Sequence, residues 1–291
     1  MSNIIIQQAV PLAKLTSWHI GGKAEYFAQP THLDELKTII ADRKSLNITW
    51  LGLGSNVLIR DAGIQGLVIA TRGLNQIKLQ ENALIYVEAG VACAKLARFC
   101  QKHGLGGGEF FAGIPGTIGG ALTMNAGAFG GETWECVQSV DVIDEAGLVS
   151  THHINEFEVS YRRVLPNFSK FLGFVGGLFQ FKSFASEEGK EKIRQLLQKR
   201  QEAQPIGTFN CGSVYRNPEG LHAAKLIDEC GFRGKRIGDA MVSEKHANFI
   251  LNTGKASAQQ VEALMKEIEE TVLERFQVKL EREVKILGHL E

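Results

Sequence analysis

The chain has 291 residues, enough for two domains, and its 44% hydrophobic and 22% charged residues are ordinary for a globular protein. The 32 Lys and Arg residues balance the 32 Asp and Glu residues, so no bulk electric field would recruit nucleic acid or an anionic membrane. Neither nucleic acid nor a membrane is therefore expected as a partner, and no obligate protein partner is inferred. Any polyanionic ligand must be held by a local site.

The cysteine and histidine spacing indicates neither a disulfide framework nor a metal site. The five cysteines are widely spaced without a C-x-x-C pair, and His152-His153 has no acidic or cysteine partner at ligand spacing. Reduced thiols fit a cytosolic compartment. The N-terminus lacks the basic lead and cleavage pattern of a signal peptide, and no apolar run approaches the length of a membrane-spanning helix. We expect a cytoplasmic protein without a bound metal.

Helices and strands alternate in the predicted order of elements. Thr31 followed by Asp34 predicts a capping-box helix start, and the apolar face of that helix comprises Leu33, Leu36, Ile39 and Ile40. Strands are predicted at 48–53, 67–71, 84–88 and 137–143, and further helices at 92–103, 186–203, 223–230 and 257–276. Ser257 with Gln260 forms a second capping box. A last strand is predicted at 278–287, where apolar and charged residues alternate.

Glycine is concentrated between residues 104 and 131, where eleven of 28 residues are Gly. Two small-residue loops, 52–56 and 113–120, could let backbone amides converge on a pyrophosphate. Neither loop matches a common phosphate-binding motif. Val57 stands where the dinucleotide-binding fingerprint needs glycine, and the P-loop pattern G-x-x-x-x-G-K-[ST] does not occur. Either loop alone could serve tight packing or turns. Both together favour a bound dinucleotide.

At this point the sequence resembles the UDP-N-acetylenolpyruvoylglucosamine reductases, flavoproteins whose FAD-binding domain is shared with the vanillyl-alcohol oxidases. The flavin-side blocks are H-I-G-G-x-A at 19–24, G-x-G-S-N-V-L at 52–58, G-I-P-G-T-I-G-G-A at 113–121 and N-A-G-A at 125–128. The resemblance continues through G-S-V-Y-R-N-P at 212–218, S-E-K-H-A-N-F at 243–249 and L-E-R-E-V at 280–284. It therefore covers nearly the whole chain in the expected order.

The resemblance implies an α+β fold. An FAD-binding domain of the vanillyl-alcohol-oxidase (PCMH) type would occupy 1–200, in two α/β subdomains at about 1–72 and 73–200. A smaller α+β substrate domain would follow at 201–279, and a C-terminal strand, 280–291, would return to the active site. Non-covalent FAD would be held by Gly52, Gly54, Ser55, Asn56, Val57, Leu58, Gly113, Ile114, Pro115, Gly116, Thr117, Gly119, Gly120, Ala121, Asn125 and Gly127.

The reaction implied is the reduction of UDP-N-acetylglucosamine enolpyruvate to UDP-N-acetylmuramate, a step of peptidoglycan precursor synthesis. NADPH would reduce FAD, hydride would pass to C3 of the substrate, and C2 would then receive a proton. By the same resemblance, Ser213 donates that proton, Arg162 holds the enol carboxylate, and Glu283 polarises the enol or orients the donor. Arg163 is a weaker candidate for the role of Arg162. Glu281, the carboxylate two residues before Glu283, is assigned no role in the reaction.

Tyr161, Arg216, Asn217 and His246 are the expected substrate-side residues. On a regular strand Arg216 would face away from Ser213, so Asn217 is preferred for the substrate and Arg216 is assigned to a diphosphate or flavin contact. Each residue also has a plain structural interpretation. Ser213 suits a turn, Arg162 an ordinary surface, Glu283 a solvated strand face, and a lone His246 a hydrogen-bonded structural role.

Some positions depart from the family pattern. Val164 replaces a small hydroxyl residue, Leu53 replaces a glycine, and Trp18-His19 stands where an aromatic and an arginine are usual. No long tyrosine-bearing insertion lies between Arg162 and Ser213, which indicates the shorter branch of the family and a substrate lid from elsewhere. Two alternatives stay open: an FAD-dependent oxidase of the same fold group that uses oxygen, or a flavin- or nucleotide-binding protein without turnover.

Overall fold

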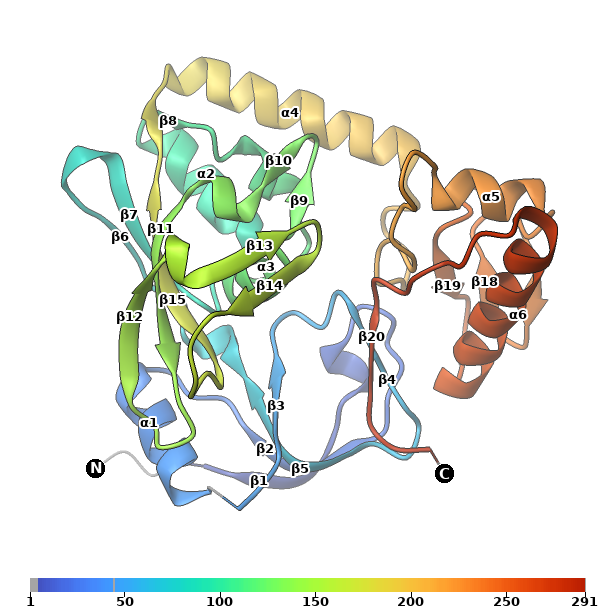
Figure 1. Cartoon of the computed structure of the whole chain (residues 1–291), viewed down its shortest axis with the longest axis horizontal. Coiled ribbons are helices and arrows are strands. Elements are labelled where there is room, and N and C mark those ends of the chain that lie inside the picture. Colours follow the sequence, from blue (N-terminus) through green and yellow to red (C-terminus); the bar gives the residue numbers. More distant parts are fainter. Residues whose placement is uncertain (1–4, 44, 291) are drawn as a thin grey trace. The chain divides into compact units, whose positions relative to one another are not determined.

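The computed structural model describes residues 5–43 and 45–290 of the chain (Figure 1). The fold separates into two compact units. Unit 1 comprises Met1–Gln7, Phe27–Leu53 and Leu67–Lys199, and unit 2 comprises Gln8–Tyr26, Gly54–Gly66 and Arg200–Glu291. Unit 2 thus combines the C-terminal third with two N-terminal segments. The functional division at 1–200, 201–279 and 280–291 stays a prediction.

A four-stranded sheet and one helix form most of the N-terminal part. The sheet has the order β1-β2-β5-β3, with β1 at Gln7–Pro11, β2 at Lys23–Ala28, β5 at Ile64–Ala70 and β3 at Ile48–Leu51. Strand β3 ends two residues before the predicted limit, because the loop begins at Gly52. Helix α1, Leu33–Asp42, buries Leu36, Ile39 and Ile40 as predicted.

The capping box predicted at Thr31 is wrong. The N-cap of α1 is His32, and its side chain makes no capping hydrogen bond. Thr31 instead donates from its backbone nitrogen and its hydroxyl to Glu35 Oε2, at 2.8 and 3.1 Å. The acidic partner of Thr31 is therefore Glu35, one residue farther along the first turn than the predicted Asp34.

Unit 1 is built on an antiparallel five-stranded sheet of order β12-β11-β15-β7-β6. Helices α2, Cys93–Lys102, and α3, Ile118–Met124, contribute Leu96, Ile118 and Leu122 to the same apolar core as Phe111 and Phe179. The five strands are β6 Ile77–Leu79, β7 Leu84–Glu88, β11 Val137–Ile143, β12 Val149–His153 and β15 Gly173–Gln180. The predicted helix at 92–103 and the strands at 84–88 and 137–143 are confirmed to within a residue.

Short ladders and turns complete unit 1. Three two-stranded ladders pair β9 Gly127–Ala128 with β10 Gly131–Glu132, β13 Phe157–Ser160 with β14 Arg163–Pro166, and β8 Leu105–Gly106 with β16 Lys182–Ser183. Helix α4 spans Ser186–Ala203, as predicted. The 3-10 helices of the chain are η1 Ala13–Leu15, η2 Thr71–Gly73, η3 Glu81–Ala83, η4 Glu109–Gly113, η5 Thr133–Glu135 and η6 Ile154–Glu156.

Unit 2 has an apolar core around helix α6, Ala258–Phe276, whose buried face includes Val261, Leu264, Met265 and Ile268. Helix α5, Ala223–Glu229, and a three-stranded sheet of order β17-β18-β19 belong to the same unit. The sheet strands are β17 Arg236–Ile237, β18 Ala240–Val242 and β19 Ile250–Asn252. Strand β4, Val57–Ile59, pairs in parallel with β20, Lys285–Leu287, which lies beside it in Figure 1.

The continuous strand predicted at 278–287 is wrong. Only Lys285–Leu287 is a strand, and Tyr215 forms an isolated bridge with Arg282. The segment changes partner along its length, since the Glu283 amide donates to Val214 O and the Lys285 amide donates to Asn56 O. The predicted alternation nevertheless holds: Leu280 and Val284 are buried, whereas Glu281 is exposed.

Among the described residues, no helix combines the length and apolar character that a bilayer crossing demands.

The capping box of α6 should contribute to the free energy of unfolding. Ser257 Oγ accepts from the Gln260 amide and Gln260 Oε1 accepts from the Ser257 amide, at 3.1 and 3.3 Å. Removing the cap by Ser257→Ala should lower the free energy of unfolding by about 1 kcal/mol, because one amide of the first turn loses its partner. Thr271→Ala is the control, since that hydroxyl bonds Glu267 O inside the helix, where alanine is the better helix former. Urea unfolding that gives equal losses for both variants would contradict the assignment.

Candidate functional site

The two glycine-containing loops meet within unit 1 at Gly52 and Thr117. A Cβ added to Gly52 would lie 2.5 Å from Thr117 Oγ1, so only glycine permits this approach. Arg72 Nε donates to Gly52 O at 3.1 Å and fixes the end of the first loop. The two loops are therefore in contact at these residues, and their convergence on a pyrophosphate stays a prediction. The remainder of the first loop, Gly54–Leu58, belongs to unit 2.

The glycines of the second loop divide by what surrounds them. Thr117 is the N-cap of α3 and accepts from the Gly120 amide at 3.4 Å, while the Gly119 amide donates to Ala89 O. A Cβ on Gly119 would lie 3.0 Å from Ala89 Cβ, so packing explains that glycine. Gly120 is exposed, and a Cβ there would find nothing closer than Thr117 Oγ1 at 3.7 Å. Protein packing does not require glycine at 120, whereas a ligand lying against it would.

Asn125 is used differently from the expectation that its amide serves the dinucleotide. It is 2% exposed and has a left-handed backbone at the C-cap of α3. Its Nδ2 donates to Glu132 Oε2 and Ser160 O, and its Oδ1 accepts from the Trp134 amide. In this structure the side chain therefore holds the glycine segment together.

Arg162 lies against the end of the same segment. It forms with Tyr161 the two-residue turn between β13 and β14, and its φ of 57° is left-handed. Its Nη1 and Nη2 donate to Asn125 O and Gly127 O, each at 3.2 Å, and its guanidinium lies 4.9 Å from the Tyr161 ring centroid. Arg163 is exposed on β14. The structure thus places Arg162 beside the glycine segment.

Three predicted residues line one cavity of about 420 Å³ in unit 2. They are Ser213, Asn217 and His246, and the other lining residues are His222, Ala224, Lys225, Asp228, Arg233, Lys245, Ala247 and Asn248. Asn217 Oδ1 also accepts from the Ala223 amide at the start of α5. Arg216 is absent from this lining and lies 3.7 Å from Glu281, as its position on the opposite side of the segment predicts.

The cavity carries positive charge that sequence reasoning missed. Lys225, Lys245 and Arg233 are lining residues. Lys225 Nζ lies 3.8 Å from Glu229 Oε1, Lys245 Nζ donates to Gln201 O, and the guanidinium of Arg233 is paired with the Asp228 carboxylate. Lys245 stands in the block at 243–249 that carried the resemblance, so its position there was the available signal. Lys225 and Arg233 had no comparable signal, because only the fold brings them to the cavity.

His246 is neutral under ordinary conditions. Burial, followed by the charge of Arg233, holds the pKa of its imidazole below the usual value. Its Nδ1 is buried and has no hydrogen-bond partner within the described part of the chain. A neutral ring with an unsatisfied nitrogen in this cavity is suited to a hydrogen bond with a ligand.

Glu283 lies on the segment next to Ser213. The Val214 amide donates to Asn248 O at 2.9 Å, and the Glu283 amide donates to Val214 O at 2.8 Å. Asn56 Nδ2 then donates to Glu283 O at 3.1 Å. Burial, followed by the charge of Glu283, raises the pKa of the Cys211 thiol. Within unit 2, the backbones that carry the predicted hydroxyl and carboxylate are neighbours.

Two family models match the chain. Residues 24–152 match an FAD binding domain, and residues 204–287 match the C-terminal domain of UDP-N-acetylenolpyruvoylglucosamine reductase. The first range contains both glycine loops, and the second contains the cavity and Glu283. The exposed position of Gly120, where packing leaves room, fits a cofactor held by backbone.

Relatives resemble the chain over nearly its full length. The UDP-N-acetylenolpyruvoylglucosamine reductase of Coxiella burnetii is 46% identical to this chain, and the match covers 96% of this chain and 94% of the relative. The reductase of Nitrosomonas eutropha is 42% identical, and the match covers 97% of this chain and 89% of the relative. The crystal structure of the Thermus caldophilus reductase has a TM-score of 0.84 and 30% identity, covering 98% of this chain and all of its own. The expected α+β fold with an FAD-binding domain is confirmed.

Two alanine substitutions separate packing from cofactor binding. Gly120→Ala should leave the flavin-free protein as stable or more stable by up to about 1 kcal/mol, because alanine favours the helix. It should nevertheless weaken FAD binding, since the methyl group enters the space proposed for the cofactor. Gly52→Ala should lower stability without FAD, because of the contact with Thr117. Melting temperatures of flavin-free protein and FAD titrations check both. Full FAD affinity in Gly120→Ala would contradict this interpretation.

The family models and the full-length relatives agree with the site, in which glycine backbone in one unit and a hydroxyl-bearing cavity in the other occupy the expected sequence blocks. The chain therefore belongs to the UDP-N-acetylenolpyruvoylglucosamine reductase family, and it is an FAD-dependent oxidoreductase.

Proposed function

We propose that the chain uses NADPH and FAD to reduce UDP-N-acetylglucosamine enolpyruvate to UDP-N-acetylmuramate for peptidoglycan synthesis. The observation that carries the proposal is the cavity that unites Ser213, Asn217 and His246, in a chain whose full-length relatives bear the name of that reductase. A cytoplasmic location is part of the proposal. It is supported by the five cysteines, which are all free thiols.

The charge of the cavity suits a nucleotide diphosphate. Arg233 is held bidentately by Asp228, whereas Lys225 Nζ lies 3.8 Å from a single carboxylate oxygen of Glu229 and Lys245 Nζ donates to the Gln201 carbonyl. The two ammonium groups are therefore the better candidates for phosphate oxygens. Asn217 and the neutral His246 offer hydrogen bonds to uncharged groups of the sugar or its acetamide. Substrate binding is thus assigned to local charges in a protein whose net charge is +0.

When bound, FAD would provide hydride chemistry for C3 of the enol ether. Ser213 is assigned the delivery of a proton to C2, where negative charge develops, and it lines the cavity from the segment next to Glu283. Glu283 is assigned the polarisation of the enol or the orientation of the donor. Arg162 is assigned the substrate carboxylate, because two carbonyl contacts fix the plane of its permanently charged guanidinium.

The role of Ser213 predicts that its loss separates the two half-reactions. Ser213→Ala should leave flavin reduction by NADPH nearly intact and slow flavin reoxidation by the enol ether by about 10²–10⁴-fold, the usual contribution of a general acid. Anaerobic stopped-flow absorbance of the flavin measures each half separately.

Equal loss in both halves would contradict the assignment of Ser213. Two outcomes with the unaltered protein would overturn the proposed function itself. Flavin that NADPH bleaches and only oxygen restores indicates an oxidase, and flavin that NADPH never bleaches indicates a binding protein.

Glu283 and Glu281 form a matched pair two residues apart. Glu281 is exposed and lies near Arg216, whereas the backbone of Glu283 is bonded to Val214 and Asn56. Glu283→Gln should slow reoxidation by the enol ether by roughly 10²-fold or more, because a neutral amide cannot polarise the enol. Glu281→Gln at saturating substrate should leave it unchanged. A larger effect for Glu281→Gln would reverse the assignment.

A further inference from the structure

The segment that carries Glu283 is bonded along its length to the segment that follows the first glycine loop. Asn56 Nδ2 donates to Glu283 O at 3.1 Å, and Asn56 O accepts from the Lys285 amide at 3.0 Å. Parallel pairing of β4 with β20 continues the contact from Val57–Lys285 to Ile59–Leu287. The Arg60 amide then donates to Leu287 O at 2.9 Å. Residues 56–60 thus bond residues 283–287 at both ends.

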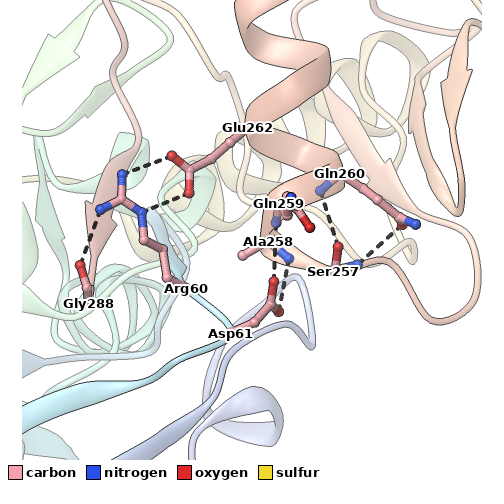
Figure 2. Close-up of polar contacts among 8 residues, drawn as sticks. All are labelled: Arg60, Asp61, Ser257, Ala258, Gln259, Gln260, Glu262 and Gly288. Carbon is pink, nitrogen blue, oxygen red and sulfur yellow. Dashed lines mark hydrogen bonds and ion pairs between the residues drawn. The ribbon is translucent and has the colours of Figure 1, made fainter. Parts of the chain in front are cut away.

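Side chains anchor the same segments to helix α6 (Figure 2). Arg60 donates from Nε and Nη2 to the two carboxylate oxygens of Glu262, at 2.8 and 2.9 Å, and from Nη1 to Gly288 O at 3.3 Å. The two side chains are only 25% and 21% exposed, so solvent screens this bidentate pair less than a surface pair. One guanidinium thereby joins β4, the end of β20 and α6.

The neighbouring Asp61 makes a second anchor. Its carboxylate accepts from the Ala258 and Gln259 amides at 3.1 and 3.2 Å (Figure 2). These are first-turn amides of a 19-residue helix, where a negative charge is favoured by unsatisfied donors and by the helix dipole. Residues 60 and 61 are therefore bonded to α6, and Leu287 and Gly288 are bonded to Arg60.

Glu283 needs such support because it lies outside any regular strand. Residues 278–284 form no ladder beyond the bridge at Arg282, and the strand begins only at Lys285. We infer that Asn56 and Arg60 are positioning residues for Glu283, holding its backbone at the two ends of the segment so that its carboxylate keeps one position. The inference rests on the proposed function, in which Glu283 acts on the enol ether.

The direct test uses Asn56→Asp and Arg60→Gln in the full-length, FAD-loaded enzyme. Aspartate keeps the shape of Asn56 but cannot donate to Glu283 O, and glutamine cannot make the bidentate contact with Glu262. With the flavin reduced by dithionite, each variant should be reoxidised anaerobically by the enol ether roughly 10- to 100-fold more slowly, the scale expected of a misplaced catalytic group. In Arg60→Gln, flavin reduction by NADPH should change by less than about twofold, because that step does not use Glu283.

A double-mutant cycle distinguishes positioning from general damage. If Arg60 acts through Glu283, Arg60→Gln combined with Glu283→Gln should be no slower than Glu283→Gln alone, whereas independent effects would multiply. Arg194→Gln is the matched control, because it removes a bidentate Arg–Glu contact in unit 1, with Glu191. It should leave both half-reactions unchanged. If the rate effects of Arg60→Gln and Glu283→Gln multiply in the double variant, the inference is overturned.

Hydrogen exchange gives a readout that does not depend on turnover. In flavin-free Arg60→Gln, peptides that cover residues 281–290 should exchange faster than in the unaltered protein, and Arg194→Gln should not change them. Unchanged exchange, or normal reoxidation in Arg60→Gln, would overturn the inference. Arg60→Gln decides the question if Asn56→Asp binds FAD poorly, since Asn56 also belongs to the expected flavin set.

The inference and the proposed function fail in different ways. Normal reoxidation in Glu283→Gln would refute the role of that carboxylate in the proposed function. Slow reoxidation in Glu283→Gln with normal reoxidation in Arg60→Gln and Asn56→Asp would refute positioning alone.

Discussion

The parallel pairing of β4 with β20 is the constraint on which unit 2 depends. It brings residues just after the first glycine loop to the last segment of the chain, and Asn56 contacts Glu283 across 227 positions of sequence. A parallel pair cannot be closed by a tight turn, so a long connection must join the two strands. The consequence is chemical as well as structural, because a loop of the expected flavin motif and the proposed catalytic carboxylate share one set of backbone hydrogen bonds.

Glycine has two separate functions in the cofactor region of unit 1. At Gly52 and Gly119 the neighbouring Thr117 and Ala89 leave no room for a side chain, so these glycines allow the loop, the strand end and the helix to approach one another. At Gly120 the space is open, so packing does not require glycine there, and we propose that FAD lies against it. On this proposal the high glycine content serves both packing and binding. Arg162 adds a fixed positive charge at the end of the same segment, where it bonds Asn125 O and Gly127 O.

Features encoded by neighbouring residues could be predicted from the sequence, and features that depend on distant partners could not. The Ser257–Gln260 cap and the limits of helix 186–203 are local, and both were predicted correctly. The strand predicted at 278–287 is too long. The alternation of apolar and charged residues indicates which side chains are buried, and it does not indicate which backbone groups accept the hydrogen bonds. Lys225 and Arg233 were missed for the same reason, since only tertiary structure brings them to Ser213. The family blocks identified Ser213 and His246, but sequence spacing alone would have favoured a turn and a structural histidine.

We propose that reduced flavin in this chain passes its hydride to an enol ether that is bound in the cavity of Ser213. The most direct measurement is a single turnover without NADPH and without oxygen. Enzyme reduced by dithionite, freed of excess reductant and mixed with UDP-N-acetylglucosamine enolpyruvate, should yield one UDP-N-acetylmuramate for each flavin, as quantified by mass spectrometry. Reduced flavin that persists beside unchanged enol ether, and reoxidises only when air is admitted, would contradict the account.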